Sequence, residues 1–361
     1  MDYRRAQKLQ TPLLLSGALL SDVGTSVSIP LVILGIAIML FAIVIGVLYY
    51  RCPHCGMPLG RIGDSVAYCP HCGKALDAPV EEPMRSISVP AYAKLNLTLD
   101  ILGKRDDGYH EMKMVMQTIH LFDRLEMKKT AGGITMTTNL SFLPTNENNL
   151  VYKAAKLLMD EFQIRDGIDV KLHKYIPVAA GMAGGSTDAA AVLYGMNRMF
   201  ELGLSKEELM QRGVKIGADV PYCIMRGTAL AEGIGEQLTA LPPMVKCPIL
   251  IAKPQISVST KFVYENLKLD ENTVHPDIDR LVEDIRRKDL AAITSDMGNV
   301  LETVTIPNYP VIAEIKEHMM EHGAAGAMMS GSGPTVFGLF DDKEKAVAAY
   351  QAATSRLEWN I

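Results

Sequence analysis

The chain has 361 residues, of which 48% are hydrophobic and 21% are charged, and its formal net charge is −5. This length allows two or three domains with well-buried cores. The mildly acidic balance and the lack of a basic run argue against a nucleic-acid partner. A phosphorylated small molecule would need only a local basic site.

The first 50 residues differ in composition from the rest of the chain. Residues 29–50 form an uncharged apolar run long enough to cross a bilayer as one helix, and Tyr49 and Tyr50 stand where interfacial aromatics are expected. A buried core helix rarely lacks every charge, and a signal peptide would start earlier and end at a small-residue cleavage site. We therefore expect a transmembrane helix at 29–50 within the N-terminal segment 1–50. Residues 11–20 are apolar but too short to cross alone, and we expect them in the membrane interface.

Residues 51–76 carry two cysteine pairs of identical spacing. The pairs are Cys52-Pro-His-Cys55 and Cys69-Pro-His-Cys72, and a glycine follows each. Such paired turns are typical of a zinc ribbon, in which four thiolates complete a closed tetrahedral shell around a structural metal. Disulfide pairing is the alternative. We expect Zn²⁺ on Cys52, Cys55, Cys69 and Cys72, and after the ribbon an acidic, proline-containing linker over residues 77–84.

Strand-like and helix-like patterns follow one another from about residue 85. Strands are predicted at residues 87–102, 118–127, 133–138 and 168–172, and helices at 149–162, 189–200 and 204–213. After residue 243 helical patterns dominate, at 259–267, 277–287, 310–322 and 343–353, with a strand at 248–252 and two strands flanking residues 330–333. Separate runs of strands and helices are typical of the α+β class.

Residues 176–191 combine a strand end, a glycine-rich turn and a helix start. Gly181, Gly184 and Gly185 carry no side chain where a backbone must approach a ligand, and Ser186 and Thr187 supply hydroxyls. Free N–H groups and the positive end of the helix dipole favour anions there, and a triphosphate is the natural ligand. The motif is not a P-loop, and it lacks the acidic residue of a dinucleotide fingerprint. Ordinary turn chemistry is the alternative.

Four further stretches, taken with this turn, resemble the motifs of the GHMP small-molecule kinases. They are Ala93-Lys-Leu-Asn96, Arg105-Asp-Asp-Gly-Tyr-His110, Gly217-Ala-Asp-Val-Pro221 and Met329-Ser-Gly-Ser-Gly333. In detail they look like the kinase family that acts on 4-diphosphocytidyl-2-C-methyl-D-erythritol. The resemblance runs from about Met84 to the end of the chain. At the turn, Ala183 replaces a glycine and Thr187 a serine of the family pattern, and neither change should abolish binding.

The resemblance implies a two-domain GHMP kinase fold with the active site between the domains. We expect an ATP-binding domain over residues 85–240 and a C-terminal domain over residues 241–361. ATP would be bound, with Mg²⁺ on Ser186 or Thr187, by the loop residues Pro177, Ala180, Gly181, Met182, Ala183, Gly184, Gly185, Ser186 and Thr187. The reaction would be phosphorylation of the 2-hydroxyl of the cytidine diphosphate substrate.

Two charged residues stand out as catalytic candidates. Asp219 is flanked by small and apolar residues, so its carboxylate must be paired or functional. Lys94 is a charge inside an apolar strand and is the obvious partner. A structural ion pair explains both residues equally well. The resemblance assigns Asp219 to accept the hydroxyl proton and Lys94 to orient that hydroxyl and neutralise charge.

The resemblance also supplies candidates for binding the cytosine of the substrate. It assigns Tyr109 and His110 to the base, with Asn96 nearby. On the residues alone, a half-buried loop aromatic would be the simpler interpretation of Tyr109. Asp188 lies in the first turn of the predicted helix, where the dipole favours an acidic residue, and we interpret it as a helix-start residue.

Other functions stay open on the sequence. Another GHMP kinase, of the mevalonate or homoserine type, is one, although it would not need a nucleobase pocket. A membrane-anchored zinc-ribbon scaffold with a disabled kinase fold is another, against which the intact Lys94 and Asp219 argue. ATP and reduced thiolates favour a cytoplasmic kinase domain tethered to the membrane, with the N-terminal side of the 29–50 span outside. Arg51 and Arg61 agree with that orientation, whereas Arg4, Arg5 and Lys8 oppose it. The ribbon's partner is not identified.

Overall fold

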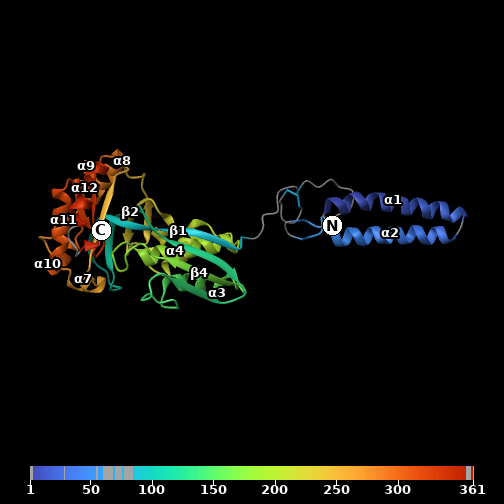
Figure 1. The fold of residues 1–361 in the computed structure, drawn as a ribbon, viewed down its shortest axis with the longest axis horizontal. Helices are drawn as coiled ribbons and strands as arrows, with labels where there is room; N and C mark the ends of the chain where they lie inside the picture. The colour runs from blue at the N-terminus through green and yellow to red at the C-terminus, as the bar shows by residue number, and fades with distance from the viewer. Residues whose placement is uncertain are drawn as a thin grey trace. The chain divides into compact units, whose positions relative to one another are not determined.

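Two long helices, α1 (Tyr3–Val27) and α2 (Ile29–Tyr49), open the chain and pack against each other along their length (Figure 1). With a mean hydropathy of 3.2, α2 is the one helix in the described part of the chain that is long and apolar enough, by length and composition alone, to cross a membrane. A helix therefore forms where the span was predicted. Residues 11–20, expected as a short separate segment, are instead part of the 25-residue helix α1.

The computed structural model describes residues 3–27, 29–53, 56–59, 68–69, 75–76, 84–354 and 359–360. The chain divides into two units, Met1–Pro83 and Met84–Ile361. The division falls within the predicted linker at residues 77–84. The kinase-like motifs all lie in the second unit, and the cysteine pairs lie in the first.

A large sheet is built around one long hairpin, β1 (Ser86–Lys104) and β2 (His110–Thr130), which pair antiparallel along nearly their whole length. The other edge of β2 pairs with β4 (Gly167–His173) near its end and with β5 (Thr228–Gly233) near its start. β3 (Ile134–Thr138) pairs parallel with β4, and β6 (Gln237–Ala240) pairs antiparallel with β5. β1 is buried almost continuously from Ala93 to Ile101, so it runs through the core of this unit.

Four helices accompany this sheet: α3 (Leu150–Glu161), α4 (Gly184–Met199), α5 (Lys206–Val214) and α6 (Val220–Met225). α4 is buried along most of its length and packs against α3 and β1. The ends of two helices are fixed locally. Asn149 caps α3 by accepting from the Val151 N–H, and Ser205 and Glu208 form a capping box on α5.

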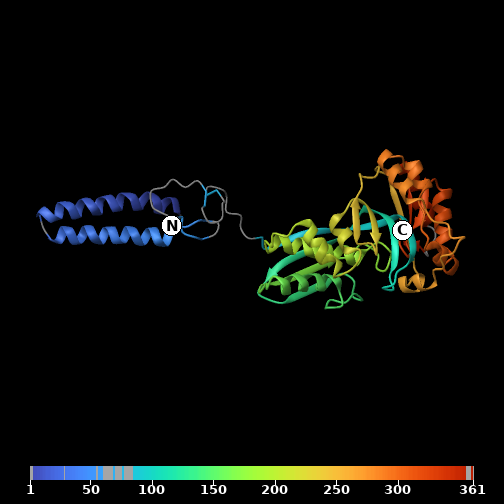
Figure 2. The same ribbon diagram turned by 180° about the vertical axis from the view of Figure 1, so that it is seen from behind.

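A second, smaller sheet follows residue 248. Its antiparallel strands run in the order β10-β7-β9-β8 and span Ile249–Pro254 (β7), Gly326–Met329 (β8), Val336–Leu339 (β9) and Trp359–Asn360 (β10). The helices of this part are α7 (Thr260–Asn266), α8 (Ile278–Arg287), α9 (Leu290–Ser295), α10 (Glu302–Asn308), α11 (Val311–Glu321) and α12 (Lys343–Thr354). They gather around the small sheet, in orange and red (Figure 2).

The predicted α+β class is confirmed, and most predicted elements appear within a few residues of their expected ends. The differences have simple causes. α6, α9 and α10 were not predicted, and each has only six or seven residues, too few to show a helical period. The strands β5 and β6 were also missed, and so was the start of β2, although Met112, Met114 and Met116 alternate with Lys113, Val115 and Gln117 in residues 110–117. Their strand conformation comes from pairing with β1 and β5.

Candidate active site

Two irregularities in the β1–β2 pairing set the floor of the site. The register shifts between Tyr92 and Lys94 and again between Asn96 and Thr98. Ala93, Leu95 and Leu97 are fully buried among apolar residues, while Lys94 and Asn96 line a cavity of about 160 Å³. Shifts of this kind re-aim side chains beside functional sites. A lysine and an asparagine can therefore stand inside an otherwise apolar strand because they open onto a cavity.

Asp219 enters the same cavity from the loop before α6. It occupies the N-cap position of that helix, yet its side chain makes no capping hydrogen bond. Its Oδ2 lies 3.9 Å from Lys94 Nζ, and Lys94 also donates to Asn96 Oδ1 at 2.8 Å. The Lys94 side chain is 6% exposed and that of Asp219 is 34% exposed. The ammonium is thus fixed and shielded, whereas the carboxylate is open to a ligand. The two residues predicted as a pair are brought together.

The glycine-rich turn ends in an uncapped helix start. Ala183, the residue before α4, is in the left-handed region (φ 55°), and no side chain caps the first N–H groups of the helix. Gly185 is exposed, and a Cβ there would meet only Leu150 at 3.5 Å. α4 is 16 residues long, so the dipole at its start is fully developed. Uncapped N–H groups beside an exposed glycine form an anion site that fits the phosphates of a nucleotide.

Not every residue predicted for this loop faces a ligand. Ala180 and Met182 are buried in the apolar core, and Met182 accepts a hydrogen bond from the Lys94 N–H at 3.2 Å. The Thr187 hydroxyl donates to the Tyr92 carbonyl at 2.8 Å and is buried. The side chains of Ala180, Met182 and Thr187 therefore do not face a ligand, and only their backbone groups could contact a nucleotide. Pro177 and Ser186 are half-buried, and Ser186 keeps its hydroxyl on the side of the Asp219 loop, near Gly217.

The second glycine turn packs directly on the first. The Ser330 hydroxyl donates to the Gly181 carbonyl at 3.1 Å, and a Cβ on Gly181 would lie 2.2 Å from the Ser330 carbonyl oxygen. Gly181 has φ 71°. A glycine is needed here because another loop occupies the space and the backbone is left-handed. Gly181 also lines the cavity of Lys94 and Asp219, so the approach of a ligand stays a prediction. This contact joins the part that carries α4 to the part that carries the small sheet.

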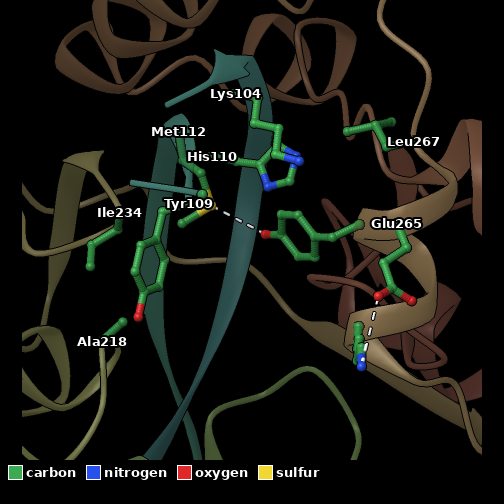
Figure 3. A pocket seen from close by; sticks show the side chains of 11 residues that line it. Lys104, Tyr109, His110, Met112, Ala218, Ile234, Glu265 and Leu267 are labelled. Atoms are coloured by element: carbon green, nitrogen blue, oxygen red, sulfur yellow. Dashed lines mark hydrogen bonds and ion pairs between the residues drawn. The ribbon is translucent and has the colours of Figure 1, made fainter. Parts of the chain in front are cut away.

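A larger cavity of about 590 Å³ lies next to the Lys94 cavity and shares Met112 and Tyr264 with it. Tyr109 and His110 line one side, and Glu265 and Leu267 of the α7 region line the opposite side (Figure 3). The ring of Tyr109 is 60% exposed. Burial, with a smaller effect of Lys104, lowers the pKa of His110, so its imidazole is neutral at pH 7. The cavity thus has an open aromatic wall and an imidazole with a lowered pKa.

Tyr264 was missed by sequence reasoning. Its ring centroid lies 5.1 Å from that of His110, and its hydroxyl contacts Met112 Sδ at 3.2 Å. Burial, and then the nearby Asp219, raises its pKa to about 12. No sequence signal separated it from the other residues of its short helix, because only the fold brings α7 opposite Tyr109. Conversely, Asn96 was predicted beside the base. It lies beside Lys94 and does not line the Tyr109 cavity.

A second buried ionic cluster supports the glycine-rich turn. Lys174 donates to Asp123 and, at 2.8 Å, to Asp188 Oδ2, and all three side chains are at most 4% exposed. Asp123 also accepts from the N–H groups of Tyr175 and Ile176. Asp188 Oδ1 is buried without a partner among the described residues, and burial raises the pKa of this carboxyl despite Lys174. Asp188, interpreted from the sequence as a helix-start residue, thus belongs to a buried charge cluster. Three alanines follow Asp188 in the sequence, so no nearby residue of its own helix can pair with the carboxylate. This was the sequence signal that its partner lies elsewhere in the fold.

The predicted zinc ligands are only partly within the described residues. Cys52 and Cys69 are buried together with Tyr50, Leu59 and Leu76, while Cys55 and Cys72 lie outside the described residues. No group of three or more His, Cys, Asp or Glu side chains is placed to hold a metal in the part of the chain that the structure describes. The metal assignment therefore stays a prediction.

Comparisons with known proteins agree with this geometry. The model of the GHMP kinases N terminal domain matches residues 149–227, and that of the GHMP kinases C terminal domain matches residues 281–358. The chain is 60% identical over 268 residues to the 4-diphosphocytidyl-2-C-methyl-D-erythritol kinase of Lachnoclostridium phytofermentans, a match that covers 74% of this chain and 92% of the relative. It is 49% identical over 276 residues to the enzyme of that name from Acetivibrio thermocellus, covering 76% and 97%.

Solved structures give the same fold. A crystal structure of 4-(cytidine 5'-diphospho)-2C-methyl-D-erythritol kinase superposes with a TM-score of 0.64 at 29% identity, covering 74% of this chain and 96% of that one. Homoserine kinase from Cytophaga hutchinsonii superposes with a TM-score of 0.65, but at 20% identity this shows the fold alone. The chain belongs to the GHMP kinase family and, within it, to the 4-diphosphocytidyl-2-C-methyl-D-erythritol kinases.

Proposed function

We propose that the protein transfers a phosphoryl group from ATP to the 2-hydroxyl of 4-diphosphocytidyl-2-C-methyl-D-erythritol, in the non-mevalonate route to isoprenoid precursors. One observation carries the proposal. The Lys94–Asp219 pair lies in a cavity that adjoins an uncapped helix start on one side and an aromatic pocket on the other. A phosphate donor and a nucleobase-bearing acceptor can thus meet at one carboxylate.

The residues divide the work of phosphoryl transfer. Asp219 accepts the proton of the 2-hydroxyl as its oxygen attacks the terminal phosphorus, and Lys94, held by Asn96, neutralises the developing charge. The first N–H groups of α4 bind the phosphates. ATP would supply the transferred group, with ADP leaving as the bond to the terminal phosphorus breaks, and Mg²⁺ would neutralise the charge of the phosphates. Ser186 is the loop hydroxyl left to hold that metal, since Thr187 donates to Tyr92.

The larger cavity would hold the cytidine half of the acceptor. Tyr109 and Tyr264 provide aromatic surfaces from opposite sides, on which a pyrimidine can stack. The neutral His110 can donate one hydrogen bond and accept another from the base edge. A mevalonate or homoserine kinase would have no use for this pocket, and neither would a scaffold without activity.

A coupled ADP-release assay on the full chain tests the proposal. Turnover is expected with the cytidine diphosphate alcohol and not with mevalonate or homoserine. Asp219→Asn should lower kcat by roughly 10²–10⁴-fold, the usual value of general-base help. Asp166→Asn, an equivalent change at an exposed carboxylate, is the control. Turnover of Asp219→Asn within a factor of a few of wild type would remove Asp219 as the base.

For residues 51–76 we propose a structural zinc ribbon. Bridges join Arg51 to Pro58 and Tyr68 to Ala75, at the same offsets from the two cysteine pairs. Cys52 and Cys69 are buried in one apolar cluster, as expected if both turns aim their sulfurs at one point. Metal analysis of the full chain should find one zinc per chain. The zinc should be lost in Cys55→Ser and retained in Cys247→Ser, and equal zinc in both would remove the assignment.

We also propose a cytoplasmic kinase domain tethered to the membrane through α2. α2 carries no charged residue, and among the apolar side chains on its surface Ile33, Leu40 and Phe41 are about 60% exposed. Such a surface suits lipid. After carbonate extraction of cell membranes, the full chain should stay with the pellet. Recovery of the intact full chain in the soluble fraction would contradict the tether.

A further inference from the structure

The contacts between α1 and α2 define an antiparallel pair with a fixed register. Gln10 lies against Gly46, Gly17 against Met39, and Ser21 against Gly35. Moving a number of residues toward the C-terminus along α1 therefore corresponds to moving the same number of residues toward the N-terminus along α2. The same register places Arg5, at the start of α1, opposite Arg51, just after the end of α2.

Small residues let the two helices approach closely. A Cβ on Gly35 would lie 2.3 Å from Ser21 Oγ, and one on Gly46 would lie 2.1 Å from Gln10 Nε2. Ala42 is fully buried between these two glycines. Close packing through small residues is the main way in which helices associate in lipid, where no hydrophobic effect drives them together. α1 and α2 therefore have a specific interface.

The side chains of α1 divide between the contact with α2 and the outer surface. Gln10 is fully buried toward α2, and its amide atoms have no hydrogen-bond partner among the described residues. The exposed Ser16 returns its hydroxyl to the Leu13 carbonyl at 3.0 Å. Leu15 and Leu19, in contrast, are more than 60% exposed. The face of α1 turned away from α2 is thus richer in apolar surface than its composition suggests.

Both helices are long enough to cross. α2 has 21 residues, and α1 continues for 19 residues after Lys8. At about 1.5 Å per residue each covers roughly 30 Å, the thickness of the hydrocarbon core. α1 alone is too polar to pass as a span, but Gln10 and Gly17 are buried against α2, while Leu15 and Leu19 lie on the outer surface. The pair can enter a membrane where α1 by itself would not.

The charges are gathered at one end of the pair. Arg4, Arg5 and Lys8 stand at the start of α1 and Arg51 follows α2, while the rest of α1 has no basic residue and one acidic residue, Asp22, which the register places opposite Leu34. Basic residues stay on the cytoplasmic side of a membrane. A single span places these two groups of charges on opposite faces, which is the conflict noted in the sequence. An antiparallel pair removes the conflict.

We propose that α1 and α2 form a transmembrane helical hairpin, with the N-terminus, the cysteine-rich segment and the kinase domain all on the cytoplasmic side. This rests on the proposed tether and replaces the topology expected from the sequence, in which the N-terminus lies outside. The partner surface is the lipid bilayer. Within the pair, Gln10 and Ser21 of α1 pack on Gly46 and Gly35 of α2.

Protease accessibility in sealed vesicles tests the hairpin on the full chain. One cleavage site is added before Met1 and a second is placed within residues 79–83. Both sites should be cut in inside-out vesicles and neither in right-side-out vesicles. Cutting of the first site only from the right-side-out face, with the second cut only from the inside-out face, would establish a single span and overturn the hairpin. Full recovery of the chain in the soluble fraction would refute the tether itself, and the ADP-release assay is independent of both results.

A cysteine at the turn shows whether the pair crosses completely. All six native cysteines lie after α2, on the kinase side of the hairpin. In right-side-out vesicles, an impermeant maleimide should therefore label Ser26→Cys and leave the wild-type chain unlabelled. An unlabelled Ser26→Cys would show that the pair does not reach the outer face, which contradicts a transmembrane hairpin.

A matched pair of substitutions tests the interface. Ala42→Leu adds volume where α2 is fully buried against α1, whereas Ala37→Leu adds the same volume on an exposed face. The first should disrupt the hairpin, so that the N-terminal site is no longer cut exclusively in inside-out vesicles. The second should behave as wild type. Identical cleavage in both variants would mean that this interface does not hold α1 in place.

Discussion

Lys174 is expected to be the most destabilising single position to neutralise in the kinase part. It is 4% exposed and donates to Asp123 and Asp188, whose side chains are 0% and 4% exposed. Lys174→Met keeps much of the apolar length of the side chain but leaves two carboxylates without their cation. Removing one partner of a buried ion pair costs about 3–5 kcal/mol. This is a large share of the roughly 5–15 kcal/mol by which a domain is stable.

The size of this effect follows from burial. Lys156 pairs with Asp160 one helical turn away, but both side chains are more than half exposed. Lys156→Met should therefore change the free energy of unfolding very little, because water already screens this pair. Adding Asp188→Asn to Lys174→Met should restore part of the loss, because one uncompensated buried charge is removed. Asp123 keeps its two backbone N–H donors and needs the lysine less.

Pulse proteolysis of the full chain in detergent, over a series of urea concentrations, measures these differences in the free energy of unfolding. Lys174→Met should unfold at clearly lower urea than wild type and Lys156→Met at nearly the same concentration. A loss below about 1 kcal/mol for Lys174→Met would refute the reasoning from burial. A double variant less stable than the single one would show that Asp188 is stabilising in its charged form.

Three further outcomes are expected. The pKa of Asp188 is raised in the folded state, so the folded protein holds this proton more tightly than the unfolded chain does. The free energy of unfolding is therefore greatest below the pKa of Asp188 in the unfolded chain, which is about 4. It falls as the pH rises through the pKa of Asp188 in the folded protein. Unfolding measured across pH should become flatter in Asp188→Asn, and an unchanged profile would assign the dependence elsewhere. Tyr109→Ala should raise KM for the cytidine substrate by the equivalent of about 1–3 kcal/mol and leave KM for ATP unchanged, whereas equal effects on both would place Tyr109 at the other nucleotide. Gly181→Ala should lower both stability and kcat, because the added Cβ would meet the Ser330 carbonyl. Gly203→Ala is the control, since Gly203 also has a positive φ but lies in open space, and this change should lower stability only slightly. Similar losses of kcat in the two variants would mean that the contact between the loops is not required.

The sequence by itself determined the chemistry of the site. Lys94 and Asp219 were found because a charge among apolar residues needs a partner or a task, and the structure places them 3.9 Å apart. The glycine-rich turn was found because glycines before a helix-forming run mark a helix start open to anions. These are local signals, in which the residue type and its immediate neighbours carry the information.

Other features were decided by tertiary structure, because they join segments distant in the chain. Tyr264 faces His110 only because the fold brings α7 to the start of β2. Thr187 was expected to face a nucleotide, but its hydroxyl is taken by the Tyr92 carbonyl, 95 residues away. Gly181 is packed by Ser330, and Asp188 pairs with Lys174, which follows β4 and also binds Asp123 of β2. Gln10, a polar residue of α1, is likewise buried by Gly46 of α2, 36 residues away. A residue's neighbours in sequence fix what it can do chemically, but its neighbours in space decide whether that chemistry is available to a ligand.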